Sequence, residues 1–265
     1  MTEKEYRSHP AISRSQLWMI SECPEKFRYY MDNPLDPTPA LLFGQAFHKM
    51  ALEPESFYHE FAVAPSVDRR TKDGKERWAS FQEEAEGKTV ITAEMHEQAV
   101  AMCGAMKAVA FAQKLLKGSR EQEFFWVDED TGEECKCRTD CLNTSYSQPI
   151  IVDVKSAENA SVDAFTRDAI KYGYDFQAAM YSDGVSRHIK QEPLFVFIVV
   201  EKKPPYAVNI FQADELFLKR GKKLYRECLE IYHDCKVTGN WYGYLGKANQ
   251  INTLALPSWL AKETE

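Results

Sequence analysis

The residues of this sequence best suited to chemistry are an acid and a base that follow an apolar segment, in "QPIIVDVKSAEN" at 148–159. The segment is rich in β-branched residues, which predicts a short buried strand. Alternate side chains of a strand share a face, so Asp153 and Lys155 point the same way, roughly 7 Å apart along the chain. Burying them as a plain salt bridge costs desolvation energy that the attraction between the charges only partly returns. The pair therefore needs a further reason to be there.

The acid–x–lysine pattern recurs in this chain, so the surrounding sequence decides its meaning. Most copies occur in segments that read as polar turns or helices, beginning at Asp73, Glu86, Glu134 and Asp234. Only Asp153 and Glu201 follow apolar strands. Glu201 has no comparable partner, and its strand leads directly into "KKPPY". The sequence therefore favours the site at Asp153.

A second carboxylate, Asp140, lies thirteen residues before Asp153, at the end of the preceding predicted strand. If the two strands pair antiparallel through the short "NTSYSQP" connection, both carboxylates reach one edge of the sheet. Two carboxylates at one point repel unless a cation lies between them, and oxygen ligands favour Mg²⁺ or Mn²⁺. Lys155 beside such an ion can orient or deprotonate a water. This arrangement suits phosphodiester hydrolysis.

The predicted elements place these residues in an α/β protein. In order, we expect helices at 13–34, 40–57, 71–86 and 92–116, a β-hairpin at 121–143, the Asp153 strand, a helix at 161–189 with a break near Gly173, strands at 194–201 and 206–212, and a helix at 213–235. Ser13 or Ser15 caps the first helix and Thr92 the fourth. Gln177 and Tyr181, four residues apart on one helix, share a face that can contact a substrate backbone or the lysine, although a simple amphipathic rim gives the same pattern.

The length and composition allow one large domain or two small ones. The chain has 265 residues, of which 44% are hydrophobic and 12% aromatic, which is ample for a core. We interpret 1–265 as a single domain. Residues 1–118 form a mainly helical part that carries His48, 119–240 an α/β core, and 241–265 a C-terminal tail.

The charge and cysteine content limit the partners and the compartment. A net charge of −7 argues against generic coating of nucleic acid, although "RRTKDGKERW" (69–78) and "KRGKKLYR" (219–226) each hold five basic residues. Each tract also reads as an ordinary solvated face. The longest apolar run, 194–200, is too short to cross a bilayer, and the first ten residues have no apolar segment of the signal-peptide type. Seven scattered cysteines favour a reducing cytoplasm, so we expect a cytoplasmic protein without membrane contact.

Four motifs occur together in this chain: "GQAFHKMALEPESF", "DRRTKDGKERW", "CKCRTD…VDVKS…YGYDFQAAMYSDG" and "ALPSWL". Their combination and order resemble the RecE (exonuclease VIII) group of PD-(D/E)XK nucleases, which is related to RecB nuclease domains and lambda exonuclease. The resemblance runs from about Ser13 to Trp259. It implies a restriction-endonuclease-like core, with helices flanking a central mixed sheet, and a helical N-terminal elaboration.

The resemblance also implies roles for single residues. His48, Asp140 and Asp153 match the family's metal ligands, Lys155 its catalytic lysine, and Gln177 with Tyr181 its QxxxY element. The Arg-Pro-Asp common at the first aspartate is Arg138-Thr139-Asp140 here, which leaves the ligand in place. Without the resemblance, His48 would read as a packed or surface histidine and Asp140 as a strand end. Glu123 can point at the same site but stays outside the predicted set.

The function implied by the resemblance is a Mg²⁺- or Mn²⁺-dependent exonuclease. It would digest linear double-stranded DNA from 5′ ends and leave 3′ single strands for an annealing recombinase, with several subunits forming a ring around the duplex. Two alternatives stay open. One is an endonuclease or single-strand nuclease of the same fold, and the other is a non-catalytic module that binds DNA ends.

The cysteines suggest two metal sites that we reject. "CKCRTDC" offers Cys135, Cys137 and Cys141, but no fourth ligand follows at the spacing of a zinc finger. Cys23 is similar in position to the iron–sulfur anchor of some RecB-type relatives, whose C-terminal cysteine cluster is missing because Cys228 and Cys235 stand alone. We therefore expect no zinc and no iron–sulfur cluster.

Overall fold

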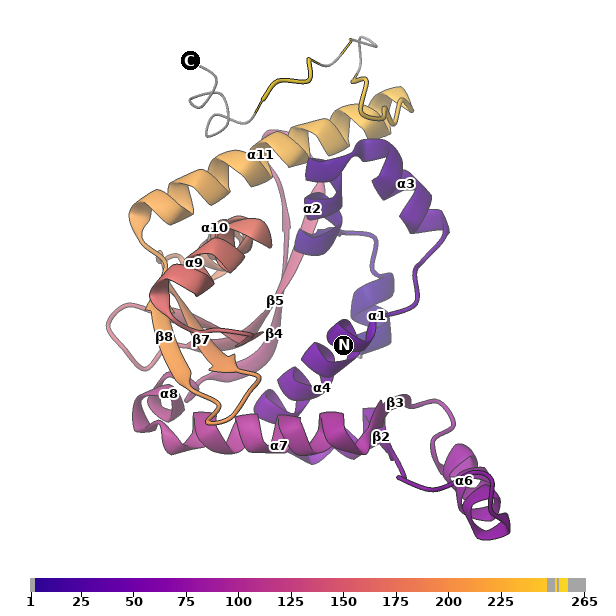
Figure 1. The fold of residues 1–265 in the computed structure, drawn as a ribbon. Coiled ribbons are helices and arrows are strands. Elements are labelled where there is room, and N and C mark those ends of the chain that lie inside the picture. The colour runs from indigo at the N-terminus through magenta and orange to yellow at the C-terminus, as the bar shows by residue number, and fades with distance from the viewer. Residues whose placement is uncertain (1–2, 247–250, 252, 257–265) are drawn as a thin grey trace.

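A six-stranded mixed sheet organises the chain, and helices cover both of its faces (Figure 1). The computed structural model describes residues 3–246, 251 and 253–256; the closing motif from Pro257, with Trp259, lies outside them. The strand order is β1-β5-β6-β7-β8, and β4 also pairs with β5. The strands are β1 (Ile12–Ser13), β4 (Ser119–Val127), β5 (Glu134–Asn143), β6 (Ile150–Ala157), β7 (Leu194–Glu201) and β8 (Val208–Gln212).

The strand pairing follows the sequence prediction closely. β4 and β5 form the expected hairpin, and β6 pairs antiparallel with β5 through Cys141 and Val152. β8 is the antiparallel partner of β7, as predicted, and β7 runs parallel to β6. These pairings bring the ends of β5 and β6 together.

One edge of β5 is shared by two short pairings. β1 runs parallel to it at Cys135 and Lys136, and β6 pairs with it only over 141–143. Within the described residues, positions 137–140 of β5 therefore have no strand beside them on that edge. Asp140 lies in this gap.

Helices α9 (Val162–Lys171) and α10 (Tyr174–Ile189) follow β6, and the predicted break lies at Gly173. Gly173 has φ +64°, in the left-handed region that favours glycine. The last helix, α11 (Glu215–Thr238), begins two residues later and ends three residues later than its prediction. Thr92 caps α7 as expected, since its hydroxyl accepts a hydrogen bond from the Met95 N–H at 3.1 Å.

Two predicted helices are each divided in the structure. Residues 13–34 form α2 (Arg14–Glu22) and α3 (Pro24–Asp32), because Cys23 is extended and Pro24 starts a new helix. Residues 92–116 form α7 (Ala93–Ala108) and α8 (Ala110–Leu115), because Val109 is extended. Neither break changes which residues reach the sheet edge.

The N-terminal part is less purely helical than predicted. Besides α1 (Glu3–Ser8), α4 (Pro39–Leu52), η1 (Pro54–Ser56), α5 (Phe57–Glu60) and α6 (Lys72–Glu84), it contains β1 and a separate two-stranded parallel sheet. The strands of that sheet are β2 (Phe61–Ala64) and β3 (Thr89–Thr92), and α6 lies between them in the chain. The four-residue strands were too short to show the alternation that predicts a strand.

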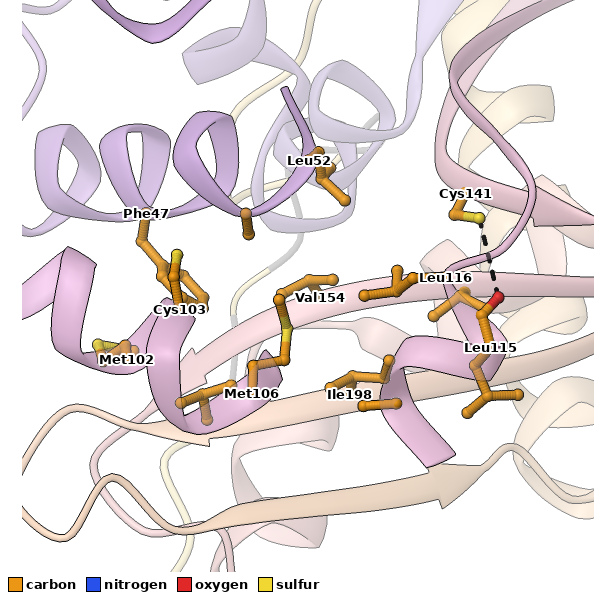
Figure 2. Close-up of a cluster of buried hydrophobic side chains, with 14 of the residues drawn as sticks. Phe47, Leu52, Met102, Cys103, Met106, Leu115, Leu116, Cys141, Val154 and Ile198 are labelled. Atoms are coloured by element: carbon orange, nitrogen blue, oxygen red, sulfur yellow. Dashed lines mark hydrogen bonds between the residues drawn. The ribbon is translucent and has the colours of Figure 1, made fainter. Parts of the chain in front are cut away.

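Apolar side chains fill both faces of the sheet. On one face, α4, α7 and α8 pack against residues such as Val154 and Ile198; Figure 2 shows this cluster, with Phe47 and Met106 at its centre. On the other face, α9 and α10 pack against Ile151 and the phenylalanines of β7. A third cluster joins α2, α10 and α11. None of the described helices is both long enough and apolar enough to cross a membrane.

Candidate metal and catalytic site

The candidate site begins where β5 and β6 separate. Their ladder stops at the pair Cys141–Val152, and beyond it the side chain of Asp140 replaces the missing backbone partner. Asp140 Oδ2 accepts a hydrogen bond from the Val154 N–H at 2.7 Å. Asp140 is therefore fixed beside β6, one residue from Asp153.

Helix α4 brings His48 to the same carboxylate. Thr38 caps this helix, and Phe47, the residue before the histidine, is buried in the core. His48 Nε2 lies 2.5 Å from Asp140 Oδ2. Desolvation alone lowers the pKa of His48, but attraction to Asp140 outweighs it, so the pKa is raised overall. Burial raises the pKa of Asp140, and His48 and Lys155 more than offset this, so it lies below its ordinary value.

The second half of the site consists of Asp153, Lys155 and Gln177. Lys155 Nζ lies 2.6 Å from Asp153 Oδ2, and Gln177 donates to Asp153 Oδ1 at 2.5 Å. Desolvation, with repulsion from Asp140, raises the pKa of Asp153. Burial lowers the pKa of Lys155, but its attraction to Asp153 and Asp140 is greater and raises it overall. The ammonium group also lies 4.8 Å from the ring centre of Tyr174.

Sequence analysis missed Glu121, an acid at the same place. The β4–β5 register pairs Arg120 with Cys141 and Gln122 with Thr139, so Glu121 is level with Asp140. Its Oε1 lies 3.7 Å from His48 Nδ1, and its Oε2 lies 2.8 Å from Arg138 Nε. Desolvation, followed by repulsion from Asp140, raises its pKa to about 7. Whether Glu121 or Glu123 lies beside Asp140 depends on the strand register, which the sequence alone does not determine.

The donor atoms fit a divalent cation. Among the described residues, His48, Glu121 and Asp140 each offer a ligand atom within 4.8 Å of the others. Asp153 Oδ2 is buried and has no hydrogen-bond donor in the described structure apart from its ion pair with Lys155. Three carboxylates and one imidazole are ligands suited to Mg²⁺ or Mn²⁺. Burial, together with repulsion from Asp140, raises the pKa values of Glu121 and Asp153, and a bound cation would stabilise the charged form of both.

A cleft of about 1300 Å³ opens onto this group. His48 and Glu121 line it, together with Glu123, Arg138 and Phe61. Glu123 thus lies in the cleft, outside the group of possible metal ligands. The size of the cleft allows an extended substrate to reach His48 and Glu121.

The structure joins most of the predicted residues into one connected group. His48 contacts Asp140, and Gln177 and Lys155 contact Asp153, while the Val154 N–H links the two halves. Tyr181 lies one turn further along α10, with its ring 6.5 Å from that of Phe195. It stabilises the neighbouring core and touches neither aspartate through a hydrogen bond in the described structure.

The rejected candidates have structural contacts of their own. Glu201 Oε1 accepts a hydrogen bond from the Ala160 N–H at 2.8 Å, which closes the loop after β6. Cys135, Cys137 and Cys141 are buried in three different apolar clusters. Burial raises the pKa of the Cys141 thiol to about 11.

Residues 13–253 match a family described as "PDDEXK-like domain of unknown function (DUF3799)". The chain belongs to this family. Its PD-(D/E)XK character, expected from the motifs around Asp140, Asp153 and Lys155, is thereby confirmed at the level of the superfamily. Membership of the RecE group stays a prediction.

One solved structure supports the same fold. A "Putative exonuclease" from Eubacterium rectale matches with a TM-score of 0.63 and 14% sequence identity, over 100% of this chain and 98% of that chain. At this identity the likeness shows the fold alone, and it confirms the predicted mixed sheet with flanking helices. The structure of SSO0001 matches with a TM-score of 0.41 and 10% identity, over 86% and 81% of the two chains. No curated protein matches the sequence.

Proposed function

We propose that this protein is a metal-dependent nuclease that hydrolyses phosphodiester bonds in DNA. The observation that carries the proposal is the connected group of His48, Asp140, Asp153 and Lys155, held where β5 and β6 separate, with His48 also lining a cleft. Membership of a PDDEXK-like family supports it. A non-catalytic module would have no need to bury opposed charges at this cost.

His48, Asp140 and Asp153 are the proposed metal ligands, and Glu121 is a fourth candidate. A bound Mg²⁺ or Mn²⁺ supplies positive charge that activates a water and stabilises the leaving oxygen. Gln177 holds the Asp153 carboxylate in one orientation. The ring of Tyr174 contacts the ammonium group of Lys155 and helps to hold it beside Asp153.

Lys155 acts on the substrate side of this group. Burial lowers its pKa, but attraction to Asp153 and Asp140 is greater and raises it overall, so the ammonium form is favoured. In that form Lys155 donates hydrogen bonds to the attacking water or to a phosphate oxygen and orients it. This favours an orienting and charge-stabilising role over that of a general base.

The finer proposal follows the RecE resemblance. The enzyme would be an exonuclease that digests linear duplex DNA from 5′ ends, leaves 3′ single strands for an annealing recombinase, and acts as a ring of several copies. Its seven cysteines are free and buried, which fits a reducing cytoplasm. Comparing linear with closed circular duplex tests this, because an end-dependent enzyme leaves the circle intact. Labels on the 5′ or 3′ ends report the polarity.

Replacing Lys155 tests the catalytic proposal. We expect Lys155→Ala to lower the single-turnover cleavage rate by about 10²–10³-fold, because a positioned donor to the reacting groups is lost. Duplex binding, measured by fluorescence anisotropy, and the circular dichroism spectrum should change little. The control is Lys114→Ala, which removes an exposed lysine from α8. Equal turnover in wild type and Lys155→Ala contradicts the mechanism.

A further inference from the structure

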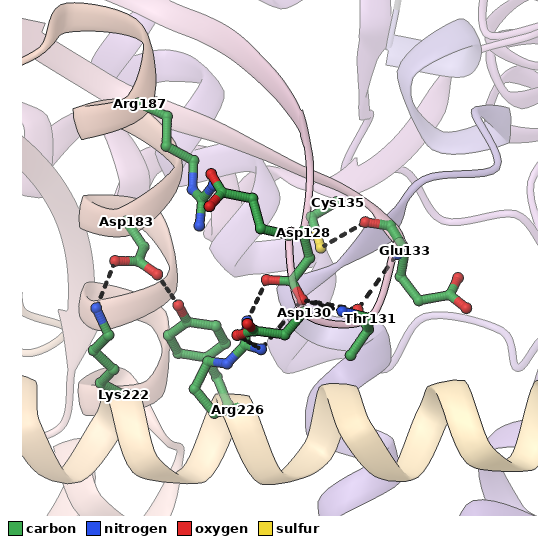
Figure 3. A network of polar contacts seen from close by, with 11 residues as sticks. Asp128, Asp130, Thr131, Glu133, Cys135, Asp183, Arg187, Lys222 and Arg226 are labelled. Atoms are coloured by element: carbon green, nitrogen blue, oxygen red, sulfur yellow. Dashed lines mark hydrogen bonds and ion pairs between the residues drawn. The ribbon is translucent and has the colours of Figure 1, made fainter.

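The two basic tracts of the sequence have different environments in the structure. The tract on α11 is largely occupied by ion pairs within the protein, as Figure 3 shows for Lys222 and Arg226. Its pairs are Arg220 with Asp175, Lys222 with Asp183, Lys223 with Glu227, and Arg226 with Asp128 and Asp130. Most of its charge is therefore neutralised by the protein itself.

The other tract, 69–77, lies on a projecting arm. The arm consists of α6 and the loop before it, and it extends away from the body of the molecule (Figure 1). The side chains of Arg70 and Lys72 are 92% and 91% exposed, and each pairs with an acid of the arm itself, Asp68 and Glu76. Lys75 and Arg77 are exposed too, and neither makes an ion pair with any described residue. The charges of Lys75 and Arg77 are thus available to a partner.

The basic residues occupy one end of the arm. Arg69 stacks over Trp78, with its guanidinium carbon 4.3 Å from the ring centre, and this fixes the loop against the helix. Gly74 allows the close approach, because a Cβ there would meet the Asp68 carbonyl oxygen at 2.0 Å. The acids Glu83, Glu84 and Glu86 follow at the opposite end of α6. Residues 68–77 hold five basic and three acidic side chains, so this end of the arm keeps an excess of positive charge while the opposite end is acidic.

The arm is attached at the rim of the cleft. Its two supporting strands, β2 and β3, contribute Phe61 and Thr89 to the cleft lining, next to His48 and Glu121. A polymer that entered the cleft would therefore pass the base of the arm. Helix α6 has 13 residues, and at 1.5 Å per residue it is about 20 Å long, enough to follow several phosphates of a duplex.

We infer that the basic end of this arm binds the phosphate backbone of duplex DNA outside the cleft. The inference rests on the proposed nuclease function and names a substrate contact that the candidate site does not include. Lysine and arginine contacts to phosphates give affinity without sequence preference, and they make binding depend on salt. The arm therefore increases affinity for duplex flanking the cleavage point and leaves the chemical step unchanged.

The test compares two double variants that remove the same charge. Lys75→Ala with Arg77→Ala changes the arm, and Lys222→Ala with Lys223→Ala changes two ion-paired lysines of α11. Each is made in full-length Lys155→Ala protein, so that a short labelled duplex stays intact during anisotropy titrations across a series of salt concentrations. We expect the arm variant to lose about 0.9 in the slope of log K against log salt for each phosphate contact removed. The α11 variant should keep the parent slope.

The same arm substitutions in the otherwise wild-type enzyme separate this inference from the proposed function. We expect weaker binding of duplex and unchanged turnover at saturating DNA. If the enzyme cuts DNA but the arm variant keeps the salt slope of its parent, only the arm contact is overturned. A change of oligomeric state with an unchanged slope likewise overturns it and assigns the arm to a subunit contact. If the arm variant loses salt slope but the wild-type protein does not cut DNA, the arm contact is supported and the nuclease function is contradicted. If the wild-type protein does not bind duplex DNA, both are overturned.

Discussion

Asp140 performs two tasks with one oxygen. Its Oδ2 accepts the Val154 N–H at 2.7 Å and lies 2.5 Å from His48 Nε2. The first contact fixes the strand that carries Asp153, and the second fixes the histidine. The geometry of the site thus depends on where the β5–β6 ladder ends, which is a property of the backbone.

The sequence predicted five residues of this group, Gln177 among them, and missed Glu121. Asp153 and Lys155 stand out because they follow an apolar strand, and Asp140 because it ends the strand before. His48 was identified only by resemblance, since no local pattern distinguishes it. Glu121 was missed because the strand register decides whether it or Glu123 is level with Asp140.

We predict that the affinity for a divalent cation rises with pH through about 7. The pKa of Glu121 is raised to about 7, and that of His48 is also raised, so protons compete with the ion below that pH. Binding of Mn²⁺ near pH 6.5 should release protons, which calorimetry in two buffers of different ionisation enthalpy measures. Glu121→Gln should bind Mn²⁺ more weakly at pH 8 and release fewer protons.

The control for this prediction is Glu123→Gln, on the same strand and in the same cleft. It should keep both the affinity and the proton release of the wild type. If Glu123→Gln has the larger effect, the ligand assignment on β4 is wrong. If affinity does not change between pH 6 and 8, Glu121 and His48 are not ligands.

At the scale of elements, the junction of α9 and α10 connects the N-terminal helices to the site. Gly173 has a positive φ, and its carbonyl accepts a hydrogen bond from Arg14 Nη2 at 2.7 Å. The next residue, Tyr174, lies beneath the ammonium group of Lys155. The position of α2 against this junction therefore influences a residue in contact with the catalytic lysine.

We predict that Gly173→Ala destabilises the protein by about 3 kcal/mol, from left-handed backbone strain and from overpacking. An added Cβ would meet Trp18 Cζ3 at 2.4 Å. The control is Gly132→Ala in the β4–β5 turn, which has φ +72° but open space around its Cβ. It should cost only about 1 kcal/mol, the backbone part. Urea unfolding measures both, and equal costs would show that Trp18 moves freely.

The sequence predicted the elements that have a strong local signal and missed a helix break that has none. Long apolar strands and the break at Gly173 were found, because β-branched runs and an isolated glycine are strong local signals. The division of 92–116 at Val109 was missed, since neither proline nor glycine marks it. The division of 13–34 does have a sequence signal, because Pro24 interrupts the helical pattern. In the structure this proline is the first residue of a new helix, α3.

At the scale of the molecule, a polar network ties the hairpin turn to the two C-terminal helices (Figure 3). Arg226 of α11 pairs with Asp128 and Asp130, and Lys236 with Glu133, across about a hundred positions of sequence. No local pattern in the sequence indicates such contacts. The network anchors the outer end of the hairpin, whose other end carries Glu121 and Asp140.

We predict that Arg226→Ala lowers the free energy of unfolding by about 3 kcal/mol, because it leaves the charge of Asp128 buried without its main partner. The Asp128 side chain is only 2% exposed. Thr131 still donates to its Oδ1 at 2.8 Å, which keeps the cost at the lower end of that range. Urea unfolding at pH 7 gives the value.

A double-mutant cycle with Asp128→Ala distinguishes a specific pair from general loss of packing. The double variant should lose less than the sum of the single variants, because no unpaired buried charge remains. Burial raises the pKa of Asp128, but hydrogen bonds from Arg226 and Thr131 outweigh it and hold the pKa below its ordinary 3.8. The stabilisation is therefore complete above that pH and is lost as the pH falls through the lower folded-state value. Additive losses in the cycle, or an Arg226→Ala effect that persists undiminished in strong acid, would show that packing of the arginine matters more than its charge.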